Sequence, residues 1–255
     1  MIKCSFTVDS IFMQMPVTVH VALPYPNFRN KKITNLWALH CAKKNGEYFF
    51  NELGLLNIVD SLSYAVIAPD LGNTFFSDTE YAKAGSFLRR ELFEIMAEKF
   101  GLSMQREQNS LLGISMGAYG ALAWLLNEPN LFNKAYLLSG VYDFAFSKEF
   151  ISKIPREQHS LFRAVMTMNK LIYNDGQYVP GCDLTELLAN CTDNSAVIRM
   201  FCGQQDGLSL EPSENMLKKL QAKGFDASLS VSSGGHEGNY WRRCLDSIFA
   251  KESLL

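Results

Sequence analysis

The sequence contains no stretch of 18 consecutive apolar residues, so no segment is predicted to cross a membrane. Its N-terminus lacks the basic segment and apolar core that mark a signal peptide, which predicts a cytoplasmic protein. A formal net charge of −2 offers no basic surface for a phosphate backbone, so nucleic acid is not an expected partner. Glycine and proline, at 17 and 8 of 255 residues, are too few for a fibrous or linker-dominated chain. What remains is a globular chain whose 47% of hydrophobic residues can fill a large core.

The cysteines show no spacing that would build a metal site. There is no Cys-x-x-Cys pair and no Cys/His pattern of the zinc-binding kind, so we expect neither a metal nor another cofactor. In a reducing compartment the thiols stay free and act as small apolar fillers. The six residues are Cys4, Cys41, Cys182, Cys191, Cys202 and Cys244.

The apolar residues predict a mostly parallel sheet with helices on both faces and an antiparallel strand pair at the N-terminus. Pro16–Leu23 alternates with period two and pairs with Lys3–Val8. Short apolar runs without alternation are typical of strands buried on both faces. They occur at Asn35–His40, Tyr64–Ala68, Ser110–Ile114, Lys134–Leu138, Ala196–Cys202 and, more weakly, Ala227–Val231. Helical patterns separate several of them, at Gly85–Phe100, Met116–Leu126, Ser213–Lys223 and Tyr240–Ala250. The alternation predicts βαβ units in one α/β domain spanning residues 1–255.

Residues 141–193 interrupt this rhythm. They contain helical patterns at Leu161–Ile172 and Leu184–Ala189 but no clear strand. An insertion after the carboxyl end of a strand lies over the ligand crevice of such a sheet, which predicts a partial cap over the site. A peripheral helical elaboration is an equally good interpretation. The Phe and Met residues in this interval suit either a pocket or an interface in a homo-oligomer.

The pentapeptide Gly113-Ile-Ser115-Met-Gly117 predicts a nucleophilic serine. It follows an apolar run and opens an apolar helix, the strand–turn–helix setting of a nucleophile elbow. Side chains at 113 and 117 would obstruct the close approach of strand and helix that this sharp turn needs. The alternative is a tight turn that contains a serine by chance.

The places of the histidines and aspartates relative to the predicted strands indicate a catalytic base and an acid to partner Ser115. His236 lies in a glycine-rich loop after the last predicted strand, whereas His20, His40 and His159 lack such a place. Asp206 directly follows the strand Ala196–Cys202, and the resulting order Ser115, Asp206, His236 is that of the α/β-hydrolase fold. The alternatives are an exposed loop histidine and a turn-forming aspartate before glycine.

Other aspartates are weaker candidates for the acid. The next candidate is Asp143, which follows an earlier strand, and Asp175 and Asp183 are more remote. An oxyanion hole needs two N–H donors, for which position suggests the backbone of Met116 and of Ala42.

Several motifs together resemble the esterase D-like family of α/β hydrolases, which includes tributyrin, feruloyl and acetylxylan esterases, S-formylglutathione hydrolases and mycolyltransferases. They are Gly113-Ile-Ser-Met-Gly-Ala-Tyr-Gly-Ala-Leu122, Gly-x-x-Asp206-x-Leu208, Gly234-Gly-His236-x4-Trp241, Leu36-Trp-Ala-Leu-His40, Ala68-Pro-Asp-Leu-Gly-Asn-Thr-Phe-Phe-Ser77 and Ser139-Gly140.

The resemblance covers about residues 15–250 and is greatest to small tributyrin-type acyl esterases. It implies a serine carboxylesterase for short acyl chains, with Ser115 as nucleophile, Asp206 as acid and His236 as base. It further implies Met116 and Ala42 as oxyanion donors. The implied reaction transfers the acyl group of a small-molecule ester to water through an acyl-enzyme, without a metal or organic cofactor.

Departures from the family pattern leave other functions open. Family members usually have glycine where this chain has Cys41, Ala118 replaces a second glycine, and Thr74 replaces an arginine. Lys43-Lys44 stand where the family is more apolar. An acyltransferase or thioesterase on the same residues is one alternative, and a non-enzymatic binding protein is another. Cys41 as nucleophile is disfavoured, because adjacent strand residues such as His40 point to opposite faces.

Overall fold

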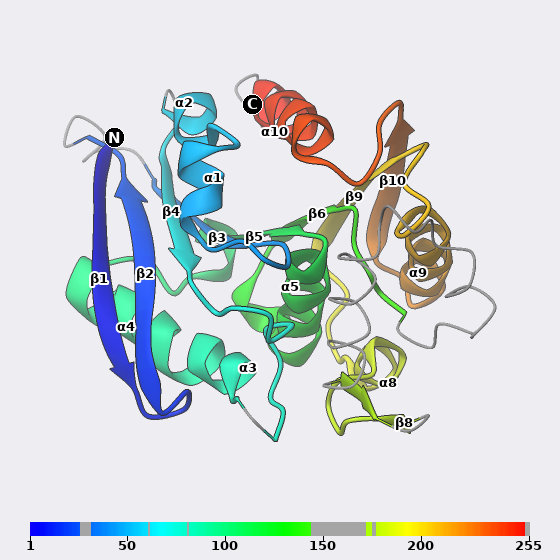
Figure 1. Ribbon diagram of the computed structural model, residues 1–255, viewed down its shortest axis with the longest axis horizontal. Coiled ribbons are helices and arrows are strands. Elements are labelled where there is room, and N and C mark those ends of the chain that lie inside the picture. Colours follow the sequence, from blue (N-terminus) through cyan, green and yellow to red (C-terminus); the bar gives the residue numbers. More distant parts are fainter. Residues whose placement is uncertain (26–31, 61, 81, 144–171, 175–176, 253–255) are drawn as a thin grey trace.

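The chain begins with the antiparallel strand pair that its alternating pattern predicts (Figure 1). β1 spans Ile2–Ser10 and β2 spans Met15–Leu23. The structure, a computed structural model, describes the whole chain apart from residues 26–31, 61, 81, 144–171, 175–176 and 253–255.

An eight-stranded sheet in the order β1-β2-β4-β3-β5-β6-β9-β10 forms the centre of the molecule. β2 pairs antiparallel with β4, and every later pairing in this sheet is parallel. This arrangement confirms the predicted fold class. The remaining strands of this sheet are β3 (Thr34–Leu39), β4 (Tyr64–Pro69), β5 (Asn109–Ile114), β6 (Lys134–Leu138), β9 (Val197–Gly203) and β10 (Asp226–Ser232).

Helices cover both faces of this sheet (Figure 1). One face carries α1 (Glu47–Asn51), α2 (Leu55–Val59) and α10 (Gly238–Glu252). The other carries α3 (Ala84–Ser86), α4 (Phe93–Phe100), α5 (Met116–Asn127), α8 (Leu184–Asn190) and α9 (Leu210–Ala222). A π-helical stretch, Phe87–Leu92, joins α3 to α4, and 3₁₀ turns lie at Arg106–Gln108 and Pro129–Leu131. Within the described ranges no helix is long and apolar enough to cross a membrane.

β3 shows why the predicted strands are apolar without alternation. Leu36 and Ala38 pack into the cluster under α1 and α10, while Trp37 and Leu39 pack into the cluster under α5. Successive side chains of a strand point to opposite faces, so a strand covered by helices on both sides needs apolar residues throughout. Because β3, β5 and β9 run parallel, their carboxyl ends lie at one edge of the sheet, where the loops that follow them meet.

The interval 141–193 is partly described. The predicted helix at Leu184–Ala189 is present as α8, which packs against α5, whereas residues 161–171 lie outside the described residues. A short hairpin of β7 (Tyr173–Asn174) and β8 (Gln177–Tyr178) is present where no strand was expected. Tyr119 of α5 donates a hydrogen bond to the carbonyl of Cys182, which fixes the chain just before α8 to α5.

Candidate active site

Ser115 occupies the sharp turn between β5 and α5. Its backbone has φ 56° and ψ −113°, a conformation that L-residues other than glycine rarely adopt. The adjacent strand stabilises the turn, because the Ser115 N–H donates to the carbonyl of Leu138 at 2.8 Å. A Cβ on Gly113 would lie 2.2 Å from the carbonyl oxygen of Gly117, and one on Gly117 would lie 1.9 Å from that of Leu39. Both glycines are thus required by the close approach that the sequence pattern predicts.

The structure brings the three residues chosen from the sequence into one line of hydrogen bonds. Asp206 lies in the turn after β9, and His236 lies in the loop between β10 and α10. Ser115 Oγ is 2.9 Å from His236 Nε2, and His236 Nδ1 is 2.9 Å from Asp206 Oδ2. In this tautomer Nδ1–H donates to the carboxylate, and Nε2 is free to accept the proton of the serine hydroxyl.

The carboxylate of Asp206 is fully buried and held from several sides. Its Oδ1 accepts the backbone N–H groups of Leu208 at 3.2 Å and Ser209 at 3.0 Å. Burial raises the pKa of Asp206, but the hydrogen bond and charge of His236, aided by Ser139 and Ser209, outweigh it and lower the pKa below its ordinary value. The group is therefore ionised at neutral pH and can stabilise an imidazolium.

The other described histidines are engaged elsewhere. His40 is completely buried, with Nδ1 bonded to the carbonyl of Cys41 at 2.9 Å and Nε2 accepting the Leu71 N–H at 3.3 Å. Burial lowers the pKa of His40, so its ring is neutral. His20 pairs with Asp70 at 3.2 Å. His159 lies outside the described residues.

The alternative aspartates also have other partners. Asp143 accepts a hydrogen bond from the Tyr178 hydroxyl at 3.0 Å. Asp183 caps α8 by accepting the Thr185 N–H at 2.8 Å. Asp175 lies outside the described residues. Among the described candidates, Asp206 is the one in contact with His236.

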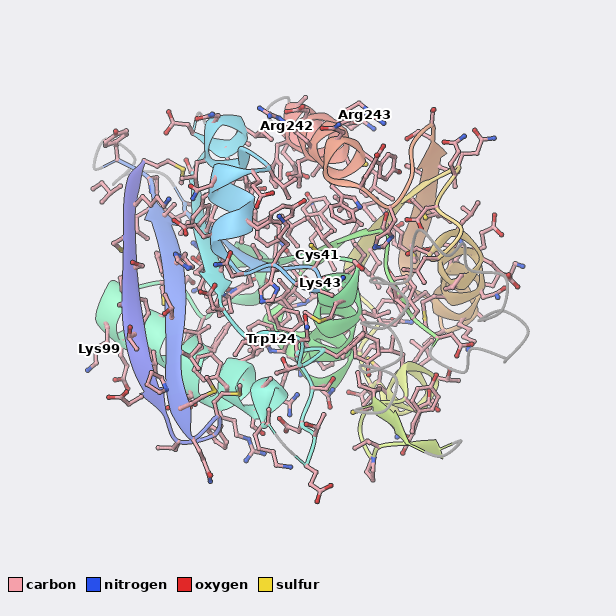
Figure 2. All side chains as sticks on the ribbon, viewed as in Figure 1. Cys41, Lys43, Lys99, Trp124, Arg242 and Arg243 are labelled. Atoms are coloured by element: carbon pink, nitrogen blue, oxygen red, sulfur yellow. The ribbon has the colours of Figure 1, made fainter. Side chains whose placement is uncertain are left out.

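A pocket of about 530 Å³ opens beside Ser115 and His236. It lies between α1 and the start of α10, and its walls combine apolar side chains with charged ones. In Figure 2, Cys41 and Lys43 lie at the N-terminal end of α5, and Arg242 projects from α10. The remaining lining residues are Ala42, Lys44, Tyr48, Glu52, Leu53, Glu237, Gly238, Asn239 and Trp241. Lys44 and Glu52 form an ion pair at 2.7 Å, so part of this charge is neutralised within the wall. No described residue of 141–193 lines this pocket.

The two residues expected to donate N–H groups to an oxyanion, Met116 and Ala42, both lie near Ser115. Met116 is the first residue of α5, where N–H groups have no partner within the helix, and Ala42 lines the pocket with Ser115. Within the described part of the chain neither N–H donates to a protein acceptor. The arrangement can therefore attack a carbonyl with a serine, move the proton with an imidazole and bind the developing negative charge.

Hydrogen bonds to residues of another segment hold the loop that carries Ala42 in place. The Lys43 N–H donates to Asn73 Oδ1 at 2.9 Å, and Lys43 itself has a φ of 65°. The Gly46 N–H donates to Asp70 Oδ1 at 2.6 Å. Gly117 lies directly against the backbone at the end of β3. The loop after β3 is therefore held by Asn73 and Asp70 on one side and by the turn around Ser115 on the other.

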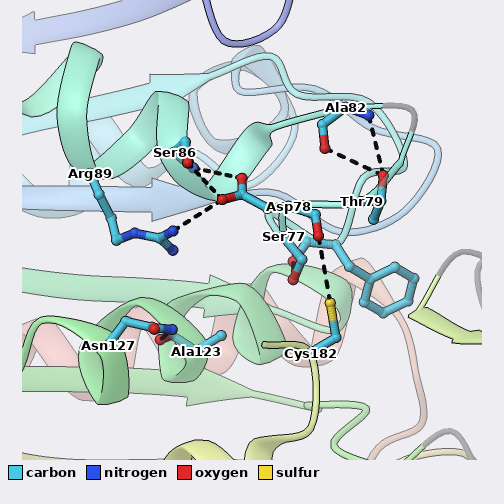
Figure 3. Close-up of polar contacts among 10 residues, drawn as sticks. Ser77, Asp78, Thr79, Ala82, Ser86, Arg89, Ala123, Asn127 and Cys182 are labelled. Atoms are coloured by element: carbon cyan, nitrogen blue, oxygen red, sulfur yellow. Dashed lines mark hydrogen bonds and ion pairs between the residues drawn. The ribbon is translucent and has the colours of Figure 1, made fainter. Parts of the chain in front are cut away.

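The segment that supplies Asn73 is itself held in an unusual conformation. Phe75 and Phe76 both have positive φ, 55° and 57°, and Phe76 lies directly on Gly120 of α5. Figure 3 shows the anchor that follows: Asp78 accepts the Ser86 N–H at 2.8 Å and the Ser86 hydroxyl at 2.6 Å, and pairs with Arg89 at 3.2 Å. These bonds tie the segment to the end of α3 and to the π-helical stretch that follows it, and so support the loop beside Ser115.

Cys41, the departure singled out in the sequence, lines the pocket but is only 5% exposed. Burial raises the pKa of its thiol to about 12, so it is protonated at neutral pH and has little nucleophilic character. His40 does not activate it, because the imidazole bonds to the Cys41 carbonyl rather than to the sulfur.

Iodoacetamide is therefore expected to alkylate Cys4 at pH 7.5 and to leave Cys41 unmodified, with activity retained. Cys4 is exposed, whereas the other five cysteines are buried. Peptide mass spectrometry of the treated protein, compared with a urea-unfolded sample, measures both modifications. Alkylation of Cys41 at the rate of Cys4, with loss of activity, would contradict this interpretation.

Sequence reasoning missed several residues at this site. Tyr48, Glu52 and Leu53 come from α1 and the turn after it, for which no helix was predicted. Ser139 and Ser209 lie beside Asp206 and His236. A serine at a strand end and one beyond an Asp-Gly turn carry no distinctive signal, and only the strand order brings them together. Among the described residues no group of three or more His, Cys, Asp or Glu side chains is placed to hold a metal ion.

Comparisons with known proteins place the chain among esterases. The model of the Esterase family matches residues 10–251 of the chain. An acetyl esterase of Caldicellulosiruptor saccharolyticus is 23% identical over 235 residues, which cover 86% of this chain and 83% of that protein.

Solved structures share the fold over nearly the whole chain. The fluorophosphonate-binding serine hydrolase FphF of Staphylococcus aureus superposes with a TM-score of 0.80 and 19% identity, covering 98% of this chain and 97% of that one. A ferulic acid esterase gives 0.76 and 18% identity, covering 97% and 95%. The S-formylglutathione hydrolase FrmB of Staphylococcus aureus gives 0.77 and 19% identity, covering 98% of both chains.

Proposed function

Because this chain belongs to the Esterase family and is a serine hydrolase, we propose that it hydrolyses short-chain acyl esters, of the acetyl or butyryl type, through an acyl-enzyme on Ser115. Its membership of this family confirms the resemblance to esterase D-like proteins drawn from the motifs. The observation that carries the proposal is the unbroken line from Ser115 through His236 to Asp206, with both hydrogen bonds at 2.9 Å, at the floor of an open pocket.

The proposed reaction has two steps. Ser115 Oγ attacks the ester carbonyl while His236 Nε2 takes its proton, and the N–H groups of Met116 and Ala42 bind the oxyanion. Collapse of this intermediate breaks the bond to the alcohol, which leaves with the proton from His236. A water molecule then attacks the acyl-enzyme with the same proton transfers and releases the carboxylic acid. Asp206 keeps the imidazole in the required tautomer throughout.

The pocket supports a short acyl chain. Its volume is about 530 Å³, and the side chains of Lys43, Lys44, Glu52, Glu237 and Arg242 make part of its wall charged. A long alkyl chain that lies against Arg242 or against the Lys44–Glu52 ion pair would gain little from burial there. The acetyl esterase among the relatives agrees with this preference.

We expect kcat/KM to be highest with acetyl and butyryl esters and about tenfold or more lower with decanoyl esters. A series of p-nitrophenyl esters varies the acyl chain with a constant leaving group, and Ser115→Ala gives the background rate. A rate that rises steadily with chain length would contradict the short-chain proposal while leaving the serine hydrolase intact.

Product analysis separates hydrolysis from acyl transfer. With an alcohol or a thiol present as a competing acceptor, we expect the free acid as the only product. Esters or thioesters of the acceptor would instead favour an acyltransferase, and faster turnover of acyl thioesters than of matched esters would favour a thioesterase. A cytoplasmic location and a homo-oligomeric state stay predictions.

A further inference from the structure

Ser139 has a backbone conformation that residues other than glycine rarely adopt. It follows β6 with a φ of 48°, in the left-handed region where glycine is the favoured residue, and Gly140 is next in the chain. The residue is fully buried, and its N–H donates to the carbonyl of Phe201 in β9 at 2.7 Å. A strained non-glycine residue next to a reactive group points to a role for its side chain.

Both oxygens of Ser139 are used. Its carbonyl accepts the hydroxyl hydrogen of Ser209 at 2.9 Å, and its Oγ accepts the indole N–H of Trp241 at 3.0 Å. Since an indole nitrogen only donates, the hydroxyl hydrogen of Ser139 is left for another acceptor. The Ser139 side chain is also among the groups whose hydrogen bonding lowers the pKa of the Asp206 carboxylate.

Ser209 contacts both Asp206 and His236. Its backbone N–H donates to Asp206 Oδ1 at 3.0 Å. Its Oγ lies 3.2 Å from His236 Nδ1. Because the Ser209 hydroxyl hydrogen is already donated to Ser139, its lone pair faces the Nδ1–H of the imidazole. Nδ1–H therefore has two acceptors, Asp206 Oδ2 at 2.9 Å and Ser209 Oγ.

Trp241 completes the enclosure. Its ring packs edge-on against the imidazole of His236, with centroids 5.2 Å apart and planes at 87°. The indole thus limits rotation of His236 on one side and, through its N–H, orients Ser139 on the other.

We propose that Ser139, Ser209 and Trp241 form a positioning cluster that holds the carboxylate of Asp206 and the imidazole of His236 in the geometry that hydrolysis requires. The proposal rests on the function assigned to Ser115, His236 and Asp206 above. Ser139 holds Ser209 through its carbonyl and Trp241 through its Oγ, and its side chain helps to lower the pKa of the carboxylate, whereas Ser209 accepts from the imidazole. The two serines therefore act on opposite members of the Asp–His pair.

This difference predicts opposite changes in pH dependence. Without the Ser139 hydroxyl, one contribution that lowers the pKa of Asp206 is lost and the carboxylate attracts the imidazolium more strongly, so the acid limb of kcat/KM moves to higher pH. Without the Ser209 hydroxyl, the imidazolium has one acceptor fewer, so the acid limb moves to lower pH.

The surrounding charges are the same in both variants. Besides Asp206, charged or titratable groups lie on each element around His236. They are Cys202 at the end of β9, Glu237, Tyr240, Arg242 and Arg243 at the start of α10, and Cys41, Lys43, Lys44, Tyr48 and Glu52 on the opposite pocket wall. Shifts of opposite sign consequently report on the two serines alone.

The test compares Ser139→Gly, Ser209→Ala and Trp241→Phe with wild type. Glycine suits the backbone of residue 139, so Ser139→Gly removes the hydroxyl without adding strain. Ser110→Ala is the matched control, since it removes another buried serine hydroxyl, bonded to Asn133 at 3.1 Å and remote from His236. The readout is the rate at which a fluorophosphonate labels the protein, and the kcat/KM of acetyl ester hydrolysis, both from pH 5 to 9.

We expect each serine variant to lower kcat about tenfold with KM nearly unchanged, and to shift the midpoint of the acid limb by roughly half a unit in the stated direction. Trp241→Phe should lower the rate and shift the midpoint in the direction of Ser139→Gly. If the midpoints of the two serine variants stay at the wild-type pH, or both move in the same direction, the positioning cluster is overturned. If wild type is neither labelled nor active, the proposed function itself fails, and the cluster with it.

Discussion

Ser115→Ala is expected to lower kcat/KM for ester hydrolysis by about 10⁴-fold or more, with the fold intact. The variant lacks the oxygen that lies 2.9 Å from His236 Nε2, so no acyl-enzyme can form. The residual rate then comes from binding and the oxyanion donors alone. Hydrolysis of p-nitrophenyl acetate measures the loss, and the absence of fluorophosphonate labelling on an intact-mass spectrum shows its cause.

A second substitution at the same position separates chemistry from folding. Ser115 has a φ of 56°, which glycine adopts at lower cost than serine or alanine. Ser115→Gly should therefore lose activity to the same extent, while the free energy of unfolding rises by about 1 kcal/mol. Ser110→Ala, on the strand β5 that precedes Ser115, should keep the wild-type rate. Wild-type hydrolysis in either Ser115 variant would remove this residue from the mechanism.

The sequence predicted the sheet well because its strands are buried on both faces. β6 was expected at Lys134–Leu138 and has those bounds, and β3 and β5 differ from their predictions by one residue at one or both ends. In such strands the apolar residues are not interrupted by an alternating polar face, so the apolar run ends close to the end of the strand. The order of the strands could not be read in the same way, because β4 lies between β2 and β3 and nothing local to these segments encodes that neighbour.

α1 and α2 were missed for a reason of length. Each has five residues, little more than one turn, which is too short to show a helical period. Gly54, with a φ of 68°, divides them. The omission matters for function, since Tyr48 and Leu53 form one wall of the pocket.

The candidate site was predictable to the extent that local motifs encode it. The glycines around Ser115 and His236 reflect tight backbone geometry, so the serine and the histidine could be chosen from short segments. Ser139 could not, because its φ and its contacts with Ser209 and Trp241 depend on β6 and β9 lying side by side. Neighbours contributed by distant segments become visible only in the folded chain.

Asp206→Asn is expected to lower kcat by about 10³- to 10⁴-fold at neutral pH. Two backbone N–H groups, of Leu208 and Ser209, point at the position of Oδ1. The amide oxygen has to occupy that position, because an NH₂ group there would face two donors. The NH₂ group is then directed at His236 Nδ1, which becomes an acceptor.

That reversal places the imidazole proton on Nε2, the atom that has to accept the proton of Ser115, so the base is blocked although every heavy atom keeps its place. Asp143→Asn is the matched control, since its carboxylate bonds to Tyr178 and it should retain the wild-type kcat. Thermal unfolding at pH 7 checks that both variants fold.

Because the pKa of Asp206 lies below its ordinary value, this carboxylate stabilises the wild type above about pH 4, and that stability is lost as the pH falls through the lowered pKa. Asp206→Asn lacks this contribution, so its unfolding temperature should depend less on pH in the acid range. Loss of kcat in Asp143→Asn together with retention in Asp206→Asn would transfer the role of the acid to Asp143.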